Sequence, residues 1–428
     1  MPAQTTVQKI IARAAGRPHV DVGAYVDVRP DYVCFQELYW PIHKANLARI
    51  GATRVVAPDR IVMVIDHTTA RAMGSIHHET HHDLERFTRE HGIRNFFKAG
   101  TGLRHLVLTE NGFARPGTLI FSDEGNIASI GAVGALNIPI STEVFVGLVR
   151  DTNWVQVPET VRIRLDGQLP RGSTARDLIQ RILADMTRSG ALLQACVEFH
   201  GPGTGGLTLD DRQTVLASLF HSGAYTGLME MDDRAWTYVR ERAAGPVFDD
   251  RSDPDAEIRS EFAYDLSGIE PMVTPPPEMD AAVPVSEVAG RRIDQATIGS
   301  CANNRLDDMR AAAWVLRGRR VAPHVALYVT PGSRSIYAEA AKEGLLTVFA
   351  EAGATVLAPG CTTCWGYQGV LSAGERLIST QQFNYHGRNG SREAEVYLAG
   401  PAVVAASAVA GEICNPLSLD APVSEGAA

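Results

Sequence analysis

The segments Ile298-Gly-Ser-Cys301-Ala-Asn-Asn-Arg305 and Ala358-Pro-Gly-Cys361-Thr-Thr-Cys364-Trp-Gly366 hold three cysteines among small and turn-forming residues. A Cys-x-x-Cys pair with one distant cysteine is typical of a metal cluster held by loops. Three thiolates are one fewer than a closed four-iron cluster uses, so one iron would stay open to water or substrate and act as a Lewis acid. This deficit indicates a catalytic cluster rather than an electron carrier.

On the residues alone, Cys361 and Cys364 have two other interpretations. They could form half of a structural zinc site, although the nearest further ligand, His386, lies well downstream. They could also form a redox dithiol that opens a helix after a strand at 355–357. The local sequence leaves the cluster, the zinc site and the dithiol open.

Composition describes an ordinary globular protein. The chain has 428 residues, of which 45% are hydrophobic and 21% charged, with a formal net charge of −9. This length predicts two or three domains. The mild negative charge does not indicate binding to nucleic acid or to a membrane surface. The N-terminus has no apolar signal region, and six cysteines are too few for a disulfide framework. A cytoplasmic protein with reduced thiols is the expectation.

Short apolar runs alternate with amphipathic segments, which favours an α/β architecture with largely parallel sheets. The pattern predicts strands at 60–66, 161–166 and 325–329 and helices at 80–91, 174–186 and 335–343. Proline and acidic residues at 251–288 predict a linker between domains. The last residues, 417–428, are small and polar and are expected to fray.

Motifs along nearly the whole chain resemble the aconitase superfamily, and within it the large subunits of the 3-isopropylmalate dehydratase and homoaconitase group. The motifs that carry the resemblance are 58–67, 157–167, 298–313, 330–334, 358–366 and 392–411. In combination they are highly specific. The resemblance implies three α/β/α domains around a central iron–sulfur cluster, at 1–152, 153–250 and 289–428, with 251–288 as the linker.

The resemblance also implies the cofactor and the catalytic residues. Cys301, Cys361 and Cys364 match the ligands of a [4Fe–4S] cluster, whereas Cys34, Cys196 and Cys414 do not and are expected to be structural thiols. Asp66 and His67 match a pair that protonates the departing hydroxyl, since a carboxylate favours the protonated form of an adjacent imidazole. Without the resemblance, a lone loop histidine more often caps a turn. The further residues assigned to the site are His105 with Asp123 as a second catalytic pair and Gln36, Asn303, Glu124, Arg388 and Phe383 around the substrate.

The site departs from the family pattern around Asp123. The family motif Thr-Asp-Ser-His-Thr reads Ser122-Asp123-Glu124-Gly125-Asn126, so serine is replaced by Glu124 and histidine by Gly125. The glutamate that partners this histidine aligns with His221, and an asparagine that contacts the cluster aligns with Ala217. One acid–base pair of the family is therefore absent.

A second departure affects carboxylate binding. The family motif Asn-Arg-Asn-Phe-x-Gly-Arg begins at Gln382, keeps its last arginine as Arg388 and has Phe383 in place of its first arginine. Arginine binds a carboxylate through two hydrogen bonds, and phenylalanine cannot. Arg388 is expected to anchor a remote carboxylate, and Phe383 to change the substrate.

The resulting prediction is a hydro-lyase, a dehydratase, hydratase or isomerase that acts on a small hydroxy-carboxylic acid other than isopropylmalate or citrate. The resemblance implies a separate small subunit, because single-chain aconitases carry a further domain with the base serine and this chain ends shortly after the third domain. No nucleic acid or membrane is expected as a partner. The alternative is a catalytically degenerate iron–sulfur sensor or binding protein.

Three further motifs have weaker interpretations. His78-Glu79-Thr80-His81-His82 matches the His-Glu-x-x-His pattern of zinc metalloproteases, a distant alternative, although a solvated helix face or adventitious metal binding explains it as well. The stretch 130–136 resembles a glycine-rich phosphate loop but predicts close helix–sheet packing. The stretch 201–206 predicts a flexible loop.

Overall fold

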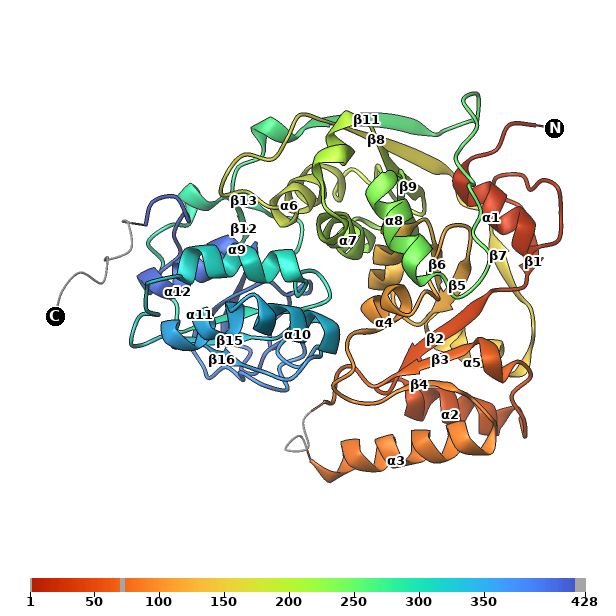
Figure 1. Cartoon of the computed structure of the whole chain (residues 1–428), viewed down its shortest axis with the longest axis horizontal. Coiled ribbons are helices and arrows are strands. Elements are labelled where there is room, and N and C mark those ends of the chain that lie inside the picture. Colours follow the sequence, from red (N-terminus) through yellow and green to blue (C-terminus); the bar gives the residue numbers. More distant parts are fainter. Residues whose placement is uncertain (1, 70–73, 420–428) are drawn as a thin grey trace. The chain divides into compact units, whose positions relative to one another are not determined.

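The computed structural model describes residues 2–69 and 74–419 (Figure 1). The chain forms two compact units. Unit 1 comprises Met1–Gly167 with Gly190–Asp265, and unit 2 comprises Gln168–Ser189 with Leu266–Ala428. Each unit has its own sheets and hydrophobic core. Of the terminal residues expected to fray, 420–428 lie outside the described residues.

The first sheet of unit 1 is parallel, with the strand order β4-β3-β2-β5-β6. Two consecutive residues of its central strand, Cys34 and Phe35, are buried in different hydrophobic clusters, so both faces of the sheet are covered. Two-sided burial explains the continuous apolar run Ile61–Val64, because neither face needs polar residues. The strands are β2 (Tyr32–Gln36), β3 (Ile61–Val64), β4 (Asn95–Phe97), β5 (Leu119–Ser122) and β6 (Leu136–Pro139).

Helices pack around this first sheet. They are α1 (Thr6–Ala14), α2 (Trp40–Arg49), α3 (Ser75–Glu90), α4 (Arg104–Glu110), α5 (Val144–Val149) and the 3₁₀ helix η3 (Gly125–Val133). The predicted strand at 60–66 is confirmed as β3. The predicted helix at 80–91 is confirmed, but α3 begins five residues earlier than predicted. The hydrophobic pattern missed its first turns because they carry polar histidines instead of an apolar face.

A second parallel sheet of unit 1 has the order β10-β9-β8-β11. A Cβ atom at Gly131 of η3 would lie 2.1 Å from the carbonyl oxygen of Gly227 in β10, which confirms the close packing predicted for 130–136. The elements are β8 (Thr160–Asp166), β9 (Cys196–His200), β10 (Thr226–Met229), β11 (Ser260–Asp265), α7 (Leu209–Ser218) and α8 (Asp233–Arg242), with the antiparallel pair β1 (Tyr25–Val28) and β7 (Asn153–Gln156).

The stretch 201–206 differs from its prediction as a loop. It forms the 3₁₀ helix η5 (Pro202–Gly206), in which Thr204 is buried. The buried guanidinium of Arg212 donates to the carbonyl oxygen of Thr204 at 2.9 Å. Glycine-rich composition indicates a turn. A local sequence pattern does not show that the buried Arg212 needs hydrogen-bond acceptors and finds one in this segment.

Unit 2 is built on a mostly parallel sheet with the order β13-β12-β18-β17-β14-β15-β16. The hydroxyl-bearing Thr174 precedes α6 and forms a capping box with Asp177, which confirms the predicted helix at 174–186. The strands are β12 (Met272–Thr274), β13 (Val283–Pro284), β14 (Gln295–Ile298), β15 (Ala326–Val329), β16 (Thr355–Val356), β17 (Arg376–Ser379) and β18 (Glu395–Ala399). The helices are α6 (Ala175–Met186), α9 (Leu306–Leu316), α10 (Arg334–Lys342), α11 (Leu345–Ala352) and α12 (Pro401–Ala410).

The α/β class with largely parallel sheets is confirmed. The three domain ranges remain a prediction. Residues 251–288, expected as a linker, carry the strands β11, β12 and β13. The prolines 275–277 follow β12 directly, so their density marks the end of a strand. Among the described residues, the helices are too short or too polar to cross a bilayer.

Candidate active site

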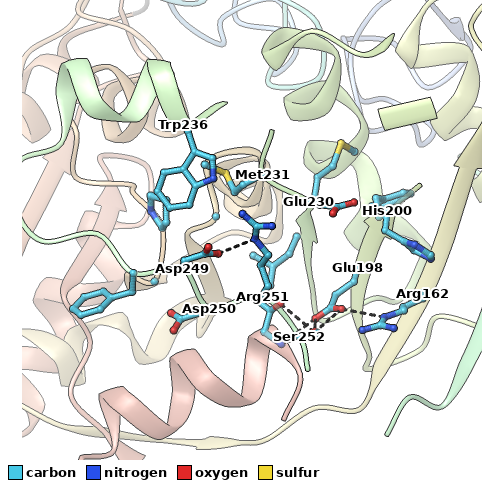
Figure 2. Close-up of a pocket in the computed structure, with 18 residues that line it drawn as sticks. Arg162, Glu198, His200, Glu230, Met231, Trp236, Asp249, Asp250, Arg251 and Ser252 are labelled. Atoms are coloured by element: carbon cyan, nitrogen blue, oxygen red, sulfur yellow. Dashed lines mark hydrogen bonds and ion pairs between the residues drawn. The ribbon is translucent and has the colours of Figure 1, made fainter. Parts of the chain in front are cut away.

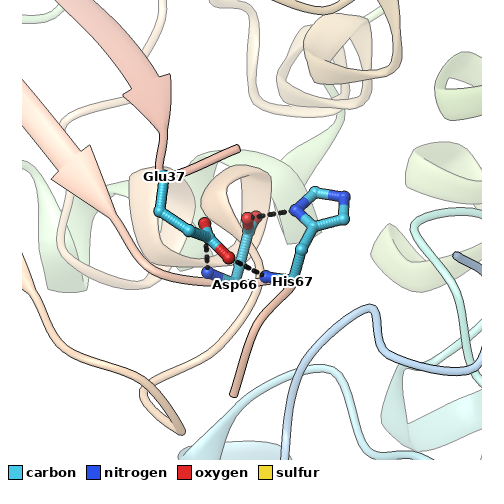
Figure 3. A group of neighbouring side chains, drawn as sticks. All are labelled: Glu37, Asp66 and His67. Atoms are coloured by element: carbon cyan, nitrogen blue, oxygen red, sulfur yellow. Dashed lines mark hydrogen bonds and ion pairs between the residues drawn. The ribbon is translucent and has the colours of Figure 1, made fainter. Parts of the chain in front are cut away.

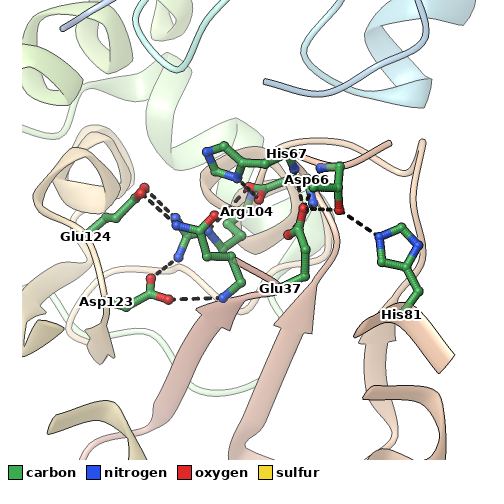
Figure 4. Close-up of polar contacts among 9 residues, drawn as sticks. Glu37, Asp66, His67, His81, Arg104, Asp123 and Glu124 are labelled. Atoms are coloured by element: carbon green, nitrogen blue, oxygen red, sulfur yellow. Dashed lines mark hydrogen bonds and ion pairs between the residues drawn. The ribbon is translucent and has the colours of Figure 1, made fainter. Parts of the chain in front are cut away.

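Polar side chains gather at the carboxyl edge of the first sheet of unit 1 (Figure 4). Gln36 ends β2, Asp66 and His67 follow β3, and Asp123 and Glu124 follow β5. Because the carboxyl ends of neighbouring parallel strands share one edge, residues far apart in sequence meet here. The structure therefore brings together five of the residues predicted for the site.

Asp66 and His67 form a buried hydrogen-bonded pair. Oδ1 of Asp66 lies 2.7 Å from Nδ1 of His67, and both side chains are at most 4% exposed. Burial alone would lower the pKa of His67, but the charge and hydrogen bond of Asp66 outweigh it and raise that pKa to about 9. Burial would raise the pKa of Asp66, yet His67 and Arg104 lower it to about 2. The pair therefore exists as carboxylate and imidazolium at neutral pH.

Glu37 holds the turn that carries this pair (Figure 3). Its carboxylate accepts the backbone N–H groups of Asp66 at 3.1 Å, His67 at 2.8 Å and Thr68 at 2.6 Å, and the Thr68 hydroxyl at 2.9 Å. Glu37, Asp66 and His67 have ligand atoms close enough to surround a metal ion. Their oxygen and nitrogen atoms are nevertheless explained by these hydrogen bonds, which makes Glu37 a backbone anchor.

Arg104 links three carboxylates. Its guanidinium contacts Asp66, Asp123 and Glu124, and its backbone N–H donates to Asp66 Oδ2 at 3.0 Å. The side chain is only 2% exposed, so it supplies the positive charge that these buried acids require. Sequence reasoning named neither Arg104 nor Glu37. Each stands directly beside a residue that was named, and this adjacency was the available signal.

The predicted pair of His105 and Asp123 is arranged differently from Asp66 and His67. Asp123 is held by Arg104 and by the backbone N–H of Gln36 at 3.1 Å. Burial raises the pKa of Asp123, and the charge of Glu124 adds to this although Arg104 opposes both. His105 lies next to Arg104 on α4 and is buried. The catalytic roles of both residues remain predictions.

Glu124 gives the site a carboxylate at the position where the motif resemblance predicts serine. Gln36 Nε2 donates to Glu124 Oε1 at 2.7 Å, and Arg104 contacts the other oxygen. The Oε1 atom of Gln36 is buried and has no hydrogen-bond partner in the described part of the chain. Such an acceptor is suited to a donor on a bound molecule.

The neighbouring glycine is matched by an aromatic ring. A Cβ atom at Gly125 would lie 2.7 Å from Cγ of Phe220, so the ring occupies the space that a side chain needs. The ring of His221 packs on Phe220 with a centroid distance of 4.0 Å. Ala217 is fully buried in α7. Phe220 therefore contacts both Gly125 and His221, two positions at which the sequence departs from the motifs that it resembles.

The three predicted ligand cysteines meet in unit 2. Cys301, Cys361 and Cys364 are reduced and at most 4% exposed, and the Cys361 thiol is in hydrogen-bonding contact with the other two. The hydrogen bond from Cys361, with the charge of Arg388, lowers the pKa of Cys364 to about 5 against the effect of burial. Cys34 and Cys196 lie buried in unit 1, as expected for structural thiols, whereas Cys414, which was expected to be buried as well, is only half-buried.

Arg388 is directed at the cysteines. Its Nε donates to the carbonyl oxygen of Cys364 at 2.9 Å, and its Nη2 lies 3.3 Å from Cys364 Sγ. The rings of Trp365, Phe383 and Tyr385 have centroids 4.7, 5.0 and 5.4 Å from its central carbon. Phe383, at the position where the motif resemblance predicts arginine, therefore packs on Arg388.

Asparagines after Cys301 complete this region. Asn303 Nδ2 donates to Asp308 Oδ1 at 2.8 Å, which leaves Oδ1 of Asn303 buried without a partner among the described residues. The amide of Asn304 is also buried, and neither of its polar atoms has a partner in the part of the chain that the structure describes. Buried amide atoms without hydrogen-bond partners fit a site in which a bound group supplies those partners.

A hollow beside the second sheet of unit 1 is lined by none of the residues predicted for the site. It has a volume of about 260 Å³ and is lined partly by Glu198, Trp236 and Ser252 (Figure 2). The Ser252 hydroxyl donates to Glu198 at 2.7 Å, and Arg162 donates to the same carboxylate at 3.4 Å. These hydrogen bonds occupy the Glu198 carboxylate, so the hollow gives no indication of a reaction.

Comparison with known proteins defines the class. A model described as the aconitase family (aconitate hydratase) matches residues 8–292 and 287–411. The chain belongs to the aconitase family, which confirms the predicted membership. It is an enzyme of the aconitase type, a hydro-lyase.

Particular relatives match over nearly their full length. The chain is 37% identical over 416 residues to 3-isopropylmalate dehydratase large subunit 1 of Methanopyrus kandleri, covering 96% of this chain and 99% of that protein. It is 38% identical over 420 residues to the probable 3-isopropylmalate dehydratase large subunit of Methanothermobacter thermautotrophicus, covering 97% and 100%. The crystal structure of Thermococcus kodakaraensis aconitase X in its holo form aligns with a TM-score of 0.50 at 11% identity, covering 83% of this chain and 84% of that one, and this likeness shows the fold alone.

Proposed function

We propose that the protein is a [4Fe–4S]-dependent dehydratase or hydratase of a small hydroxy-carboxylic acid, with a specificity changed from that of its named relatives. The observation that carries this proposal is the meeting of Cys301, Cys361 and Cys364 with Arg388 directed at one of them. The metalloprotease alternative has no comparable support, since the family model accounts for nearly the whole chain.

The residues of unit 2 fit such a cluster. Among residues 2–69 and 74–419, the hydrogen-bond partners of Arg388 belong to Cys364 and Tyr385, and none of them is a carboxylate. A buried cation needs an anion, and a cluster held by three thiolates supplies one. Arg305, also buried, donates to the carbonyl oxygens of Cys301 and Ala302 and holds the first cysteine loop. When bound, such a cluster supplies an iron with an open position that acts as a Lewis acid.

The acid of the reaction is assigned to His67. Nδ1 of His67 is engaged by Asp66, so the proton delivered to the leaving hydroxyl is the one on Nε2, and the oxygen departs as water. Glu37 fixes the backbone of both residues and so fixes the ring direction. A proton donor with a pKa of about 9 stays protonated throughout the neutral range.

The changed specificity rests on Phe383. With an aromatic ring in place of one arginine, and with Arg388 engaged by Cys364, unit 2 offers fewer guanidinium donors to a substrate carboxylate. We propose a substrate with an apolar group, or one fewer carboxylate, on that side. Glu124 and the buried Oε1 of Gln36 add acceptors, which suit a substrate hydroxyl.

A separate small subunit is part of the proposal. The relatives that this chain matches over 99–100% of their length carry the name large subunit. The resemblance assigns to a small subunit the base that removes the carbon-bound proton. The large subunit alone is expected to be nearly inactive. We place the protein in the cytoplasm, which keeps its six free cysteines reduced.

The test begins with iron and sulfide content and electron paramagnetic resonance of the anaerobically reconstituted protein and of Cys364→Ser. A panel of 2- and 3-hydroxy acids is then added, with and without a candidate small subunit, and the α,β-unsaturated product is followed by its ultraviolet absorbance. An oxygen-labile cluster whose spectrum shifts with one acid supports the proposal. A cluster without turnover favours the sensor, and absence of iron from the reconstituted wild type contradicts both.

A further inference from the structure

Helix α3 carries four histidines on two successive turns, at positions 77, 78, 81 and 82. Residues three and four apart on a helix lie on the same face. The ring of His78 has centroid distances of 5.5 Å to His81 and 6.2 Å to His82. The imidazole of His78 thus lies within reach of those of His81 and His82.

These histidines line a hollow of about 350 Å³ in unit 1. Thr68, Glu85 and Lys98 also line it, and Lys98 Nζ pairs with Glu85 Oε1 at 2.8 Å. The Glu85 carboxylate is therefore already engaged. The donors that face the hollow are mainly imidazole nitrogens.

The hydrogen bonds of His81 define which of its nitrogens can bind a further group. The Thr68 hydroxyl donates its one proton to Glu37 Oε1 at 2.9 Å. The 2.7 Å contact between Thr68 Oγ1 and His81 Nε2 must then be an N–H donated by the histidine (Figure 4). In the neutral ring Nδ1 keeps its lone pair, so His81 can act as a ligand through Nδ1 while Nε2 stays attached to Thr68.

We propose that His78, His81 and His82 form a site for one divalent transition-metal ion of the zinc type. Imidazole nitrogens suit zinc, nickel and copper, whereas magnesium and calcium prefer oxygen ligands. Two imidazoles on one ion must lie close together, since each metal–nitrogen bond is about 2.0–2.1 Å long. The ring of His78 is close enough to those of His81 and His82 for rotation of the side chains to bring their nitrogens to one ion.

The site is tied to the turn of the Asp66–His67 pair. His81 holds Thr68, Thr68 holds Glu37, and Glu37 accepts the backbone N–H groups of that turn. An ion on His81 stiffens this chain of hydrogen bonds. Glu79 is exposed on α3, so the site lacks the buried general base that a protease would need.

The first experiment titrates Zn²⁺ into the full chain with its cysteines occupied by the reconstituted cluster, followed by calorimetry. The wild type is compared with the double variant His78→Ala/His82→Ala and with His91→Ala, a histidine at the end of the same helix. We expect one ion per wild-type chain, the same affinity in His91→Ala, and binding at least about tenfold weaker in the double variant. Equal binding in the double variant, or no binding by the wild type, overturns the site. Circular dichroism checks that each variant keeps its helices.

The second experiment measures amide hydrogen exchange at Asp66, His67 and Thr68. Addition of Zn²⁺ should slow exchange at these amides in the wild type and leave it unchanged in the double variant. Unchanged exchange in a wild type that has bound the ion would overturn the connection to the turn. Because both readouts are independent of turnover, their failure is distinguishable from failure of the proposed hydro-lyase activity.

Discussion

Nδ1 of His67 lies 2.7 Å from Oδ1 of Asp66 within a turn whose backbone N–H groups are all directed at Glu37. The carboxylate keeps the imidazole protonated, and the turn keeps it in place. In the proposed reaction, an imidazolium held in this way donates its proton from Nε2 without reorganisation of its surroundings.

Replacement of Asp66 by Asn should remove the charge that sustains the His67 imidazolium. Burial then lowers the pKa of His67, so the alkaline limit of kcat/KM, expected near pH 9 in the wild type, should move to lower pH. The rate at neutral pH should fall by about 10²–10⁴-fold. A pH profile with the identified substrate measures both effects. Asp255→Asn, at an exposed position, is the control, and an unmoved alkaline limit in Asp66→Asn would exclude His67 as the acid.

The same pair gives the fold a pH dependence. The folded-state pKa of His67, about 9, lies above its unfolded value of 6.5, so its contribution to stability is complete below pH 6.5 and is lost as the pH rises through 9. Thermal unfolding of the wild type should therefore shift to lower temperature between pH 6.5 and 9, and this shift should shrink in Asp66→Asn. A shift of equal size in both proteins would assign it to other groups.

Replacement of Arg104 by Met should leave three buried or half-buried carboxylates without their shared cation. We expect a loss of about 3–5 kcal/mol in the free energy of unfolding, measured with urea, because a buried charge without its partner is costly. The triple variant Arg104→Met/Asp123→Asn/Glu124→Gln should recover part of the loss. Arg54→Met, at an exposed position, should change little. A triple variant no more stable than Arg104→Met would argue against an electrostatic role.

Replacing Gly125 by histidine, the residue that the motif resemblance predicts there, should destabilise this protein. The new side chain would meet the ring of Phe220, which lies 2.7 Å from the position of its Cβ atom. We expect a loss of about 1–3 kcal/mol for Gly125→His, largely relieved in Gly125→His/Phe220→Ala. Gly205→His is the matched control, since nothing lies within 4 Å of a Cβ atom there. Equal unfolding free energies for Gly125→His and the wild type would contradict the contact.

Replacement of Arg388 by Gln should weaken the hold on a cluster. The variant loses the guanidinium donor 3.3 Å from Cys364 Sγ and the charge beside it. Iron release to a chelator should become about tenfold faster, by analogy with other groups that support metal ligands. Arg392→Gln, on the same loop but exposed, is the control. If Arg388 binds only a substrate carboxylate, iron release would stay unchanged and the KM alone would rise.

The relation between sequence and fold is clearest in the parallel sheets. The apolar run at Ile61–Val64 predicts a strand covered on both faces, and β3 is such a strand. The capping residue Thr174 predicts the start of α6 for the same local reason. Predictions that rested on composition alone were less accurate. The glycines at 201–206 and the prolines near β12 describe turns but do not reveal which strands and buried side chains surround them.

The sequence by itself determined the parallel α/β class through its periodicity, which is a local property. Its motifs determined the family by resemblance, and the same resemblance predicted the residues of the site. Only the tertiary structure decided how those residues are engaged. Arg104 became the cation of three acids, Arg388 turned to Cys364, and Phe220 filled the space beside Gly125. These are contacts between residues distant in the chain, and their energies depend on burial and on which partners the folded backbone brings together.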